Sequence, residues 1–222
     1  MSDQAQWTAV DDYLNGKLVA EEAVLTAALR ASTDAGLSPI NVAPNQGKLL
    51  HILALSIGAH RILEVGTLGG YSTIWMARAL PADGRLISLE IDPRAAETAR
   101  SNIARAGLSH LVEVRLGRAL DLLPVLAGEI AEPFDLCFID ANKSDNAAYF
   151  DWSLKMTRPG GLIIIDNVVR HGRVIDAGNP DPNILGVRAL MDRMAVEPRI
   201  TATAIQTVGS KGYDGLAIAR VN

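Results

Sequence analysis

The chain has 222 residues, of which 49% are hydrophobic and 21% charged, as expected of one globular domain. The formal net charge of −4 and the lack of any long basic run argue against a nucleic-acid partner and against binding to an anionic membrane surface. A single cysteine, Cys137, excludes a disulfide framework, and its apolar surroundings in FDLCFID predict a buried thiol.

The first residues are polar and acidic, so they lack the basic and apolar regions of a signal peptide. The longest apolar window, LLHILALSIGA, is too short to span a bilayer. We therefore expect a cytoplasmic protein with no membrane-spanning segment.

Helical patterns occupy residues 3–35 and resume after a break that contains Gly36, Pro39 and Pro44. Beyond the break, helical patterns alternate with short apolar runs at residues 61–66, 85–90, 111–117, 134–140 and 161–166. This alternation, with nearly continuous apolar strands, predicts a doubly wound α/β fold with a mostly parallel sheet and helices on both faces. We predict one domain over residues 1–222, with an N-terminal helical extension (1–40) and a core (41–222) that binds the ligands discussed below.

The C-terminal part departs from this alternation. A helix near residues 183–196 precedes two strand patterns, RITATAIQTVG and YDGLAIARV, which are joined by GSKG. Such a short glycine-rich connection predicts an antiparallel hairpin at the sheet edge. Residues 170–182 are polar and rich in glycine and proline, so we predict a surface loop at the end of the sheet where ligands bind.

A glycine turn follows the first predicted strand, in the segment ILEVGTLGGYST. Gly66, Gly69 and Gly70 allow a tight turn and a close approach of the backbone to a ligand, and the next helix is expected to start near residues 71–72. The spacing matches neither a P-loop nor G-x-G-x-x-G, which weakens a nicotinamide-cofactor interpretation. Glu64, two residues before Gly66, places a negative charge that favours a cationic ligand.

The second predicted strand ends in LEID, which places Glu90 at the same crevice. A carboxylate there can accept hydrogen bonds from both ribose hydroxyls of an adenosine-type cofactor. Glu90 and Asp92 can also cap the following helix, and we assign the cap to Asp92, beside Pro93, and ribose binding to Glu90. Together, Glu64 and Glu90 favour S-adenosylmethionine, which carries an ammonium and a sulfonium group.

Polar residues also end the fourth and fifth strands. Asp166 and Asn167 alone could mark a turn or a helix cap. Because the fourth and fifth strands are expected to be neighbours, Asp140 would join them and supply oxygen ligands suited to Mg²⁺ or Mn²⁺. Lys143 is either a surface lysine that opens a helix or, beside a cation in a partly dry pocket, a general base. His171 lies in a loop and is expected to be solvated.

Four motifs in order carry a family resemblance: ILEVGTLGGYSTIWMARAL, LEIDP, FIDANK and IIDNVVR. Together they resemble the cation-dependent O-methyltransferases of the catechol and caffeoyl-coenzyme A type, over about residues 40–222. The resemblance implies the class I methyltransferase fold, a seven-stranded sheet with a reversed last strand. It also implies that Asp140, Asp166 and Asn167 bind the metal and that Lys143 is the base.

The same resemblance implies a set of residues that line the cofactor pocket. These residues are Val42, Glu64, Gly66, Thr67, Ser72, Glu90, Ile91, Ala119, Asp140 and Tyr149. Asp140 thus counts as a catalytic, cofactor-binding and metal-binding residue. Many family members have aspartate where this chain has Asn142, which removes one charge beside the metal. The loop at 170–182 also lacks the tryptophan of the plant enzymes, so a coenzyme A ester is not inferred as the acceptor.

We therefore expect an S-adenosylmethionine- and metal-dependent O-methyltransferase that acts on one hydroxyl of a vicinal diol of the catechol type. The alternatives are a nicotinamide-dependent oxidoreductase on a similar sheet and a non-catalytic, dimeric cofactor-binding protein. No suitably placed Tyr/Lys proton donor supports the former, and a complete Asp140, Lys143, Asp166 and Asn167 set argues against the latter. We also expect a homodimer with contacts from the region before Gly36 and from the 200–220 hairpin. The alternative is that this region packs only on its own domain.

Overall fold

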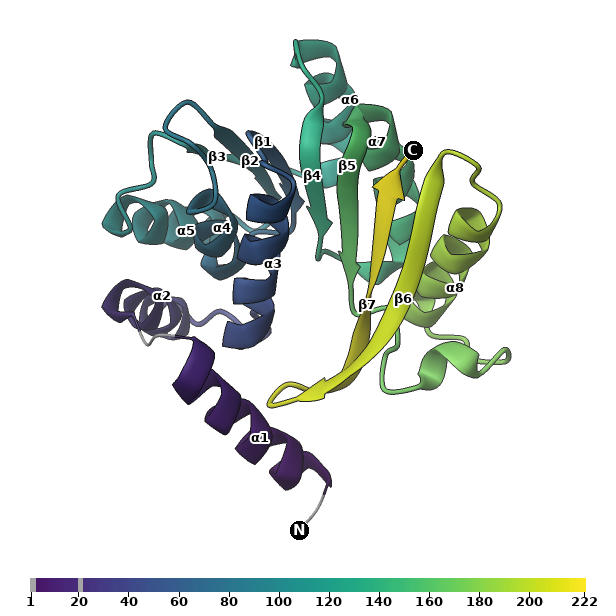
Figure 1. Cartoon of the computed structure of the whole chain (residues 1–222), viewed down its shortest axis with the longest axis horizontal. Helices are drawn as coiled ribbons and strands as arrows, with labels where there is room; N and C mark the ends of the chain where they lie inside the picture. Colours follow the sequence, from purple (N-terminus) through teal and green to yellow (C-terminus); the bar gives the residue numbers. More distant parts are fainter. Residues whose placement is uncertain (1–2, 20–21) are drawn as a thin grey trace.

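The computed structural model describes residues 3–19 and 22–222, and its centre is a seven-stranded sheet of order β3-β2-β1-β4-β5-β7-β6 (Figure 1). The strands are β1 (Arg61–Val65), β2 (Arg85–Glu90), β3 (Val112–Leu116), β4 (Phe134–Ile139), β5 (Thr157–Asp166), β6 (Ile200–Gly209) and β7 (Gly212–Val221). All neighbours up to the β4–β5 pair are parallel, whereas β7 is antiparallel to both β5 and β6. The predicted sheet and its C-terminal hairpin are confirmed.

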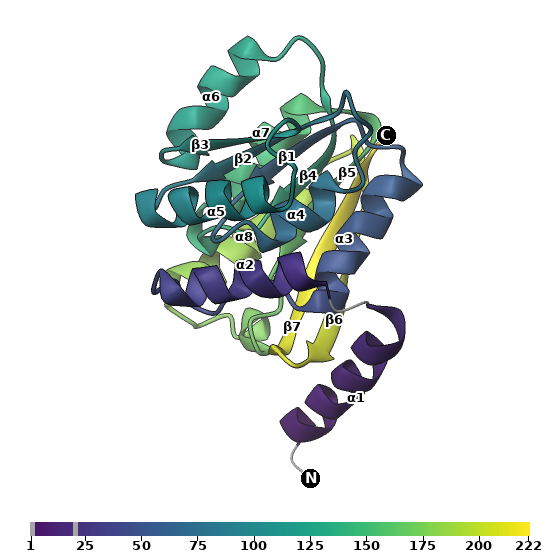
Figure 2. The same cartoon turned by 90° about the vertical axis from the view of Figure 1, so that its left-hand side faces the viewer.

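Helices cover both faces of the sheet (Figures 1 and 2). They are α1 (Asp3–Leu18), α2 (Ala23–Asp34), α3 (Pro44–Ser56), α4 (Tyr71–Ala77), α5 (Pro93–Arg105), α6 (Ala119–Glu129), α7 (Asn146–Met156) and α8 (Pro182–Ala195), with short 3₁₀ turns at Lys143–Asp145 and Arg173–Ile175. In the described part of the chain, no helix is both long and apolar enough to cross a membrane.

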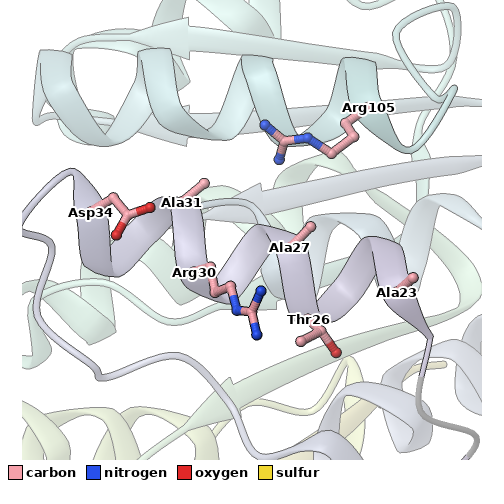
Figure 3. Close-up of a pocket in the computed structure, with 7 residues that line it drawn as sticks. All are labelled: Ala23, Thr26, Ala27, Arg30, Ala31, Asp34 and Arg105. Carbon is pink, nitrogen blue, oxygen red and sulfur yellow. The ribbon is translucent and has the colours of Figure 1, made fainter.

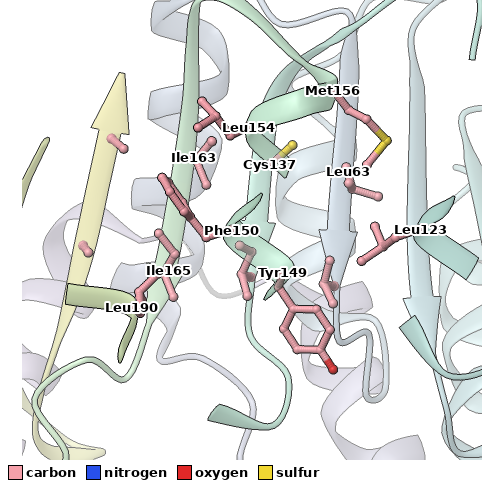
Figure 4. Close-up of a cluster of buried hydrophobic side chains, with 14 of the residues drawn as sticks. Leu63, Leu123, Cys137, Tyr149, Phe150, Leu154, Met156, Ile163, Ile165 and Leu190 are labelled. Atoms are coloured by element: carbon pink, nitrogen blue, oxygen red, sulfur yellow. The ribbon is translucent and has the colours of Figure 1, made fainter. Parts of the chain in front are cut away.

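Alternating residues of the strands point to opposite faces of the sheet and belong to two hydrophobic clusters, one on each face. Leu63 and Val65 join a cluster that is closed by α6, α7 and α8 (Figure 4). Ile62 points to the other face, where residues of α2, α3, α4 and α5 complete a second cluster. Cys137 is fully buried in the first cluster, as predicted, and burial raises the pKa of its thiol to about 12.

Two helices begin with the same pair of residues, an aspartate N-cap followed by proline. Asp92 caps α5 by accepting hydrogen bonds from the backbone N–H groups of Arg94 and Ala95, at 2.8 and 3.4 Å, so the predicted cap is confirmed. Asp181 accepts from Asn183 N at 2.9 Å at the start of α8. In each case proline occupies the first helical position, where its missing N–H costs nothing.

Two boundaries differ from the sequence prediction. The helical region predicted over residues 3–35 contains two helices, α1 and α2. Residues 20–21, between them in the sequence, are outside the described part of the chain. Strand β5 starts at Thr157 rather than 161, because Thr157 already pairs with Phe134 across an irregularity in the ladder. The ladder with β4 resumes at Leu162, opposite Leu136, and Gly160 in the interval has φ +80°.

The N-terminal helix α1 is fixed to distant parts of the chain. The buried carboxylate of Asp11 accepts hydrogen bonds from Ser210 N in the β6–β7 turn, at 2.7 Å, and from Asn45 Nδ2 in α3, at 2.9 Å. This places α1 beside the hairpin turn, at the same end of the sheet as the carboxyl ends of β4 and β5 (Figure 1).

Candidate functional site

The carboxyl ends of β4 and β5 bring together the predicted metal-binding residues. Ile139 and Ile165 are register partners in adjacent parallel strands, so Asp140 and Asp166 follow side by side. Lys143 is only 6% exposed, and its Nζ donates to Asp140 Oδ1 at 2.7 Å. Asn167 follows directly, and its backbone N–H donates to Asp166 Oδ1 at 2.8 Å. The structure thus places all four predicted residues at one edge of the sheet.

Burial dominates the electrostatics of Asp166. Because Asp166 is buried beside the negative charge of Asp140, its pKa rises to about 7, against the lowering effects of Lys143 and of hydrogen bonds from Asn167 N and the Gln46 side chain. A buried carboxyl group whose ionisation is disfavoured by a neighbouring carboxylate fits a cation bound beside it. Sequence reasoning missed Gln46, because nothing in the sequence relates α3 to the end of β5.

The donor set also bears on which metal could bind. Nowhere in residues 3–19 and 22–222 do three or more histidine, cysteine, aspartate or glutamate side chains form a group that could hold a metal ion. The candidate site therefore rests on the two carboxylates of Asp140 and Asp166 and the amide of Asn167. Such an all-oxygen set fits Mg²⁺ or Mn²⁺ and does not fit zinc, which favours nitrogen and sulfur ligands.

The glycine turn packs directly against this edge. Gly66 has φ +96°, and a Cβ built on it would lie 2.2 Å from the carbonyl oxygen of Asp140. Any side chain at this position would therefore displace the backbone of the predicted metal ligand. Helix α4 begins at Tyr71, as the sequence predicted, and Gly70 directly before it adopts a left-handed conformation.

Glu90 holds the glycine turn through backbone amides. Its Oε2 accepts from Thr67 N and Leu68 N at 3.1 and 2.8 Å, and its Oε1 accepts from Ile91 N and Asp92 N at 2.8 and 2.9 Å. Leu68 has φ +49°, which non-glycine residues adopt rarely. Glu90 therefore stabilises the turn, and ribose hydroxyls would have to share or replace these donors.

Glu64 lies beneath the turn and is fully buried. Three hydroxyl groups donate to its carboxylate, those of Ser72 and Thr73 at 2.5 Å and that of Ser88 at 2.7 Å. Burial outweighs these hydrogen bonds and raises the pKa of Glu64 to about 7. Sequence reasoning placed this charge at the crevice but did not identify the hydroxyl groups that surround it.

The remaining predicted cofactor residues take different positions around the crevice. Val42 and Ala119 are buried, whereas Ile91 is 65% exposed. Tyr149 is buried, but its hydroxyl reaches Asn142 Oδ1 at 2.5 Å, and burial raises the pKa of the phenol to about 12. Asn142 itself is exposed and donates to Ser144 Oγ and Asp145 Oδ2, so its side chain is committed to the 3₁₀ turn.

A separate groove of about 580 Å³ lies between α2 and α5 (Figure 3). It is lined by Ala23, Thr26, Ala27, Arg30, Ala31, Asp34 and Arg105. None of the residues predicted to bind the cofactor or the metal borders this groove, so it is distinct from the candidate site.

Seven strands in this order, with an antiparallel last strand and helices on both faces, form the class I methyltransferase fold. The O-methyltransferase family model matches residues 17–221. A catechol O-methyltransferase of Niastella koreensis is 49% identical over 213 residues, which are 96% of each chain. The chain therefore belongs to the O-methyltransferase family, and the resemblance seen in the four motifs is confirmed.

Solved structures agree with this membership. The O-methyltransferase from Bacillus cereus, in complex with SAH, matches with a TM-score of 0.97 and 51% identity over 99% of this chain and 100% of that one. TomG from Streptomyces achromogenes, an O-methyltransferase involved in tomaymycin synthesis and solved in complex with SAM, matches with a TM-score of 0.97 and 49% identity over the whole of both chains. These relatives favour methyl transfer over a nicotinamide-dependent reaction.

The burial of Glu64 predicts a specific pH dependence of stability. Its pKa rises from an ordinary 4.5 to about 7 on folding. Its ionisation therefore opposes folding, and stability should fall by about 3 kcal/mol as the pH rises from 4.5 through 7. The Glu64→Gln variant should lack this pH dependence. The unfolding free energy of the wild type should therefore fall, relative to that of the variant, by about this amount as the pH rises. Urea titrations of the cofactor-free proteins at pH 5 and pH 8 measure it, and parallel behaviour of both proteins would refute the buried ionisation.

Proposed function

We propose that this enzyme transfers a methyl group from S-adenosylmethionine to one hydroxyl of a vicinal diol of the catechol type. In this proposal Asp140, Asp166 and Asn167 hold a divalent cation, Mg²⁺ or Mn²⁺, and Lys143 is the general base. The observation that carries the proposal is the group of half-buried Asp140 with buried Lys143 and Asp166 at adjacent strand ends. A lone carboxylate cap would not need a second carboxylate and a buried lysine beside it.

The cofactor assignment draws on the turn and on the relatives. Two close structural relatives were solved with SAM or SAH, and the catechol O-methyltransferase of Niastella koreensis indicates the acceptor class. We assign the methionine and ribose parts of S-adenosylmethionine to the crevice beside Gly66 and Glu90. The full proposed set is Val42, Glu64, Gly66, Thr67, Ser72, Glu90, Ile91, Ala119, Asp140 and Tyr149.

The chemistry follows from the acidity of the acceptor. A phenol has a pKa near 10, so at neutral pH it is mostly protonated and a poor nucleophile. A divalent cation, when bound, supplies a positive charge that favours ionisation of a hydroxyl next to it. Lys143 Nζ, in its uncharged amine form, accepts the proton of that hydroxyl. The oxygen then attacks the sulfonium methyl carbon directly, the carbon–sulfur bond breaks, and the neutral thioether S-adenosylhomocysteine leaves. The protein's other contribution is to hold the oxygen and the methyl group close and aligned.

The contacts of Lys143 support this proposed role. Its Nζ donates a hydrogen bond to Asp140 Oδ1, and its charge lowers the pKa of Asp166, so it is close to both proposed metal ligands. Gly186 of α8 lets the helix approach this residue, because a Cβ there would lie 2.1 Å from Lys143 O. The lysine backbone is therefore fixed by the fold rather than by a mobile loop.

Metal removal tests the proposed site. EDTA should abolish methyl transfer while calorimetry still detects S-adenosylmethionine binding, because the cation contacts the acceptor and not the cofactor. Added Mg²⁺ or Mn²⁺ should restore the rate, and Asp166→Ala should stay inactive in either metal. The control is a matched acceptor with one hydroxyl, which cannot chelate and should react far more slowly than the diol. Activity of Asp166→Ala that is normal and resistant to EDTA would show that Asp166 only caps the strand end.

Substitution of Lys143 tests the base. Lys143→Ala should lower turnover by roughly 10²–10⁴-fold, the usual contribution of general base catalysis. Lys143→Arg keeps a positive charge beside Asp140 but does not accept a proton from a phenol, so it should be nearly as slow. Single-turnover methyl transfer with a catechol acceptor measures both variants. A near-normal rate for the arginine variant would mean that the residue serves Asp140 only as a counter-ion.

We also propose that two copies of the chain associate through α1 and β6. Residues Val10, Tyr13 and Leu18 of α1 are exposed, and so are Ile205 and Val208 of the edge strand β6. Long, uncharged edge strands such as β6 favour pairing with another chain. Although Asp11 fixes α1 to its own hairpin, this contact leaves the apolar side chains uncovered.

Light scattering at micromolar concentration should therefore give the mass of a dimer. Replacing Tyr13 and Ile205 by glutamate should reduce the mass to that of a monomer, because charges on this surface would be buried on association. A monomeric mass for the wild-type protein would show that α1 packs only on its own domain.

A further inference from the structure

The loop after β5 has an unusual backbone conformation. Asn167, Arg170 and His171 have φ values of +58°, +55° and +57°. Asparagine tolerates this left-handed region, but arginine and histidine adopt it rarely, because their Cβ atoms clash with the backbone. Three such residues within five positions require contacts that stabilise the loop, and these residues lie directly beside the proposed metal ligands.

One carboxylate from a distant strand supplies those contacts. Asp214 Oδ1 accepts hydrogen bonds from Val169 N at 3.0 Å, Arg170 N at 2.8 Å and Gly215 N at 3.0 Å. Val169 is buried, so its N–H needs a partner within the protein. Asp214 therefore satisfies the backbone of a loop that lies more than forty residues earlier in the chain.

The next residue along β7 completes the attachment. Gly215 O accepts from Val168 N at 3.0 Å. A Cβ at Gly215 would lie 2.5 Å from Val169 Cγ2, so the loop rests directly against the strand. On the other side, Asp166 still pairs with Leu216 of β7. Asn167 is thus held between two segments that are both fixed to the start of β7.

We propose that Asp214 is a positioning residue for the metal site. It holds the loop after β5 in the left-handed conformation that keeps Asn167 beside Asp166 and Asp140. Three N–H donors converge on its Oδ1, so Asp214 acts on the site through the backbone of the loop. This inference rests on the proposed metal-dependent function and assigns to Asp214 the geometry of that site.

The test measures Mn²⁺ binding to the full chain by calorimetry, without any acceptor. Asp214→Ala should weaken Mn²⁺ binding by about 10–100-fold, as loss of a group that orients metal ligands usually does. Binding of S-adenosylmethionine should change less than about two-fold, because the cofactor crevice lies at β1 and β2. Amide hydrogen exchange at Val169 and Arg170 should become faster in the same variant.

Asp135→Ala is the matched control. The Asp135 carboxylate likewise accepts two backbone hydrogen bonds, from His60 N and Arg61 N at 2.8 Å, but it is buried, pairs with Arg158 and lies at the amino ends of β1 and β4. It should lower the melting temperature without changing Mn²⁺ affinity. If Asp214→Ala does not fold, Asp214→Asn decides, since it keeps the acceptor oxygen but loses the charge, and it should bind Mn²⁺ several-fold more weakly.

Two outcomes overturn the proposal in distinguishable ways. Wild-type Mn²⁺ affinity in a folded Asp214 variant would remove the role of Asp214 and leave the metal site intact. Failure of the wild-type protein itself to bind Mn²⁺ would refute the metal site, and the role of Asp214 with it.

Discussion

The proposed chemistry depends on the repulsion between two carboxyl groups at adjacent strand ends. Asp140 and Asp166 end β4 and β5, and burial with mutual repulsion raises the pKa of Asp166 to about 7. The buried Lys143 donates to Asp140, and the backbone N–H of Asn167 donates to Asp166. The cost is understandable if a cation neutralises the pair during the reaction. Lys143 partly offsets the repulsion, because its positive charge lowers the pKa of Asp166.

Two loops at the candidate site are held in the same way, by a carboxylate that accepts hydrogen bonds from their backbone N–H groups. Glu90 accepts the amides of Thr67 and Leu68 in the glycine turn, and Asp214 accepts those of Val169 and Arg170 in the loop after β5. In both loops a non-glycine residue adopts a left-handed conformation. Backbone N–H groups in such tight turns lack partners within the turn, and here carboxylates from the sheet accept their hydrogen bonds.

Local patterns in the sequence predicted much of the site. The strand ends at Asp140 and Asp166, the start of α4 after Gly70 and the cap at Asp92 all follow from patterns within a few residues. The adjacency of β4 and β5 followed from the rules of doubly wound sheets, and that was enough to bring the two carboxyl groups together.

What the sequence did not predict depends on contacts between distant segments. The division of the 3–35 region into α1 and α2 accompanies separate attachments, of Asp11 to Ser210 and of Asn102 to Ala28. The hydroxyl groups around Glu64 and the amides bound by Asp214 likewise come from other elements. Such partners are chosen by tertiary packing, so a single sequence carries no local signal for them. The role of Asn142 also changes, because the structure shows its side chain bonded to Tyr149 and to the 3₁₀ turn.

The most direct test of this account is a crystal structure of the protein with Mn²⁺ and SAH, with anomalous diffraction used to locate the manganese. The account predicts one strong anomalous peak at the carboxyl ends of β4 and β5, within about 2.0–2.3 Å of oxygens from Asp140, Asp166 and Asn167. An anomalous peak at another position would contradict the proposed metal site. So would the lack of any anomalous peak there when the three side chains are well ordered.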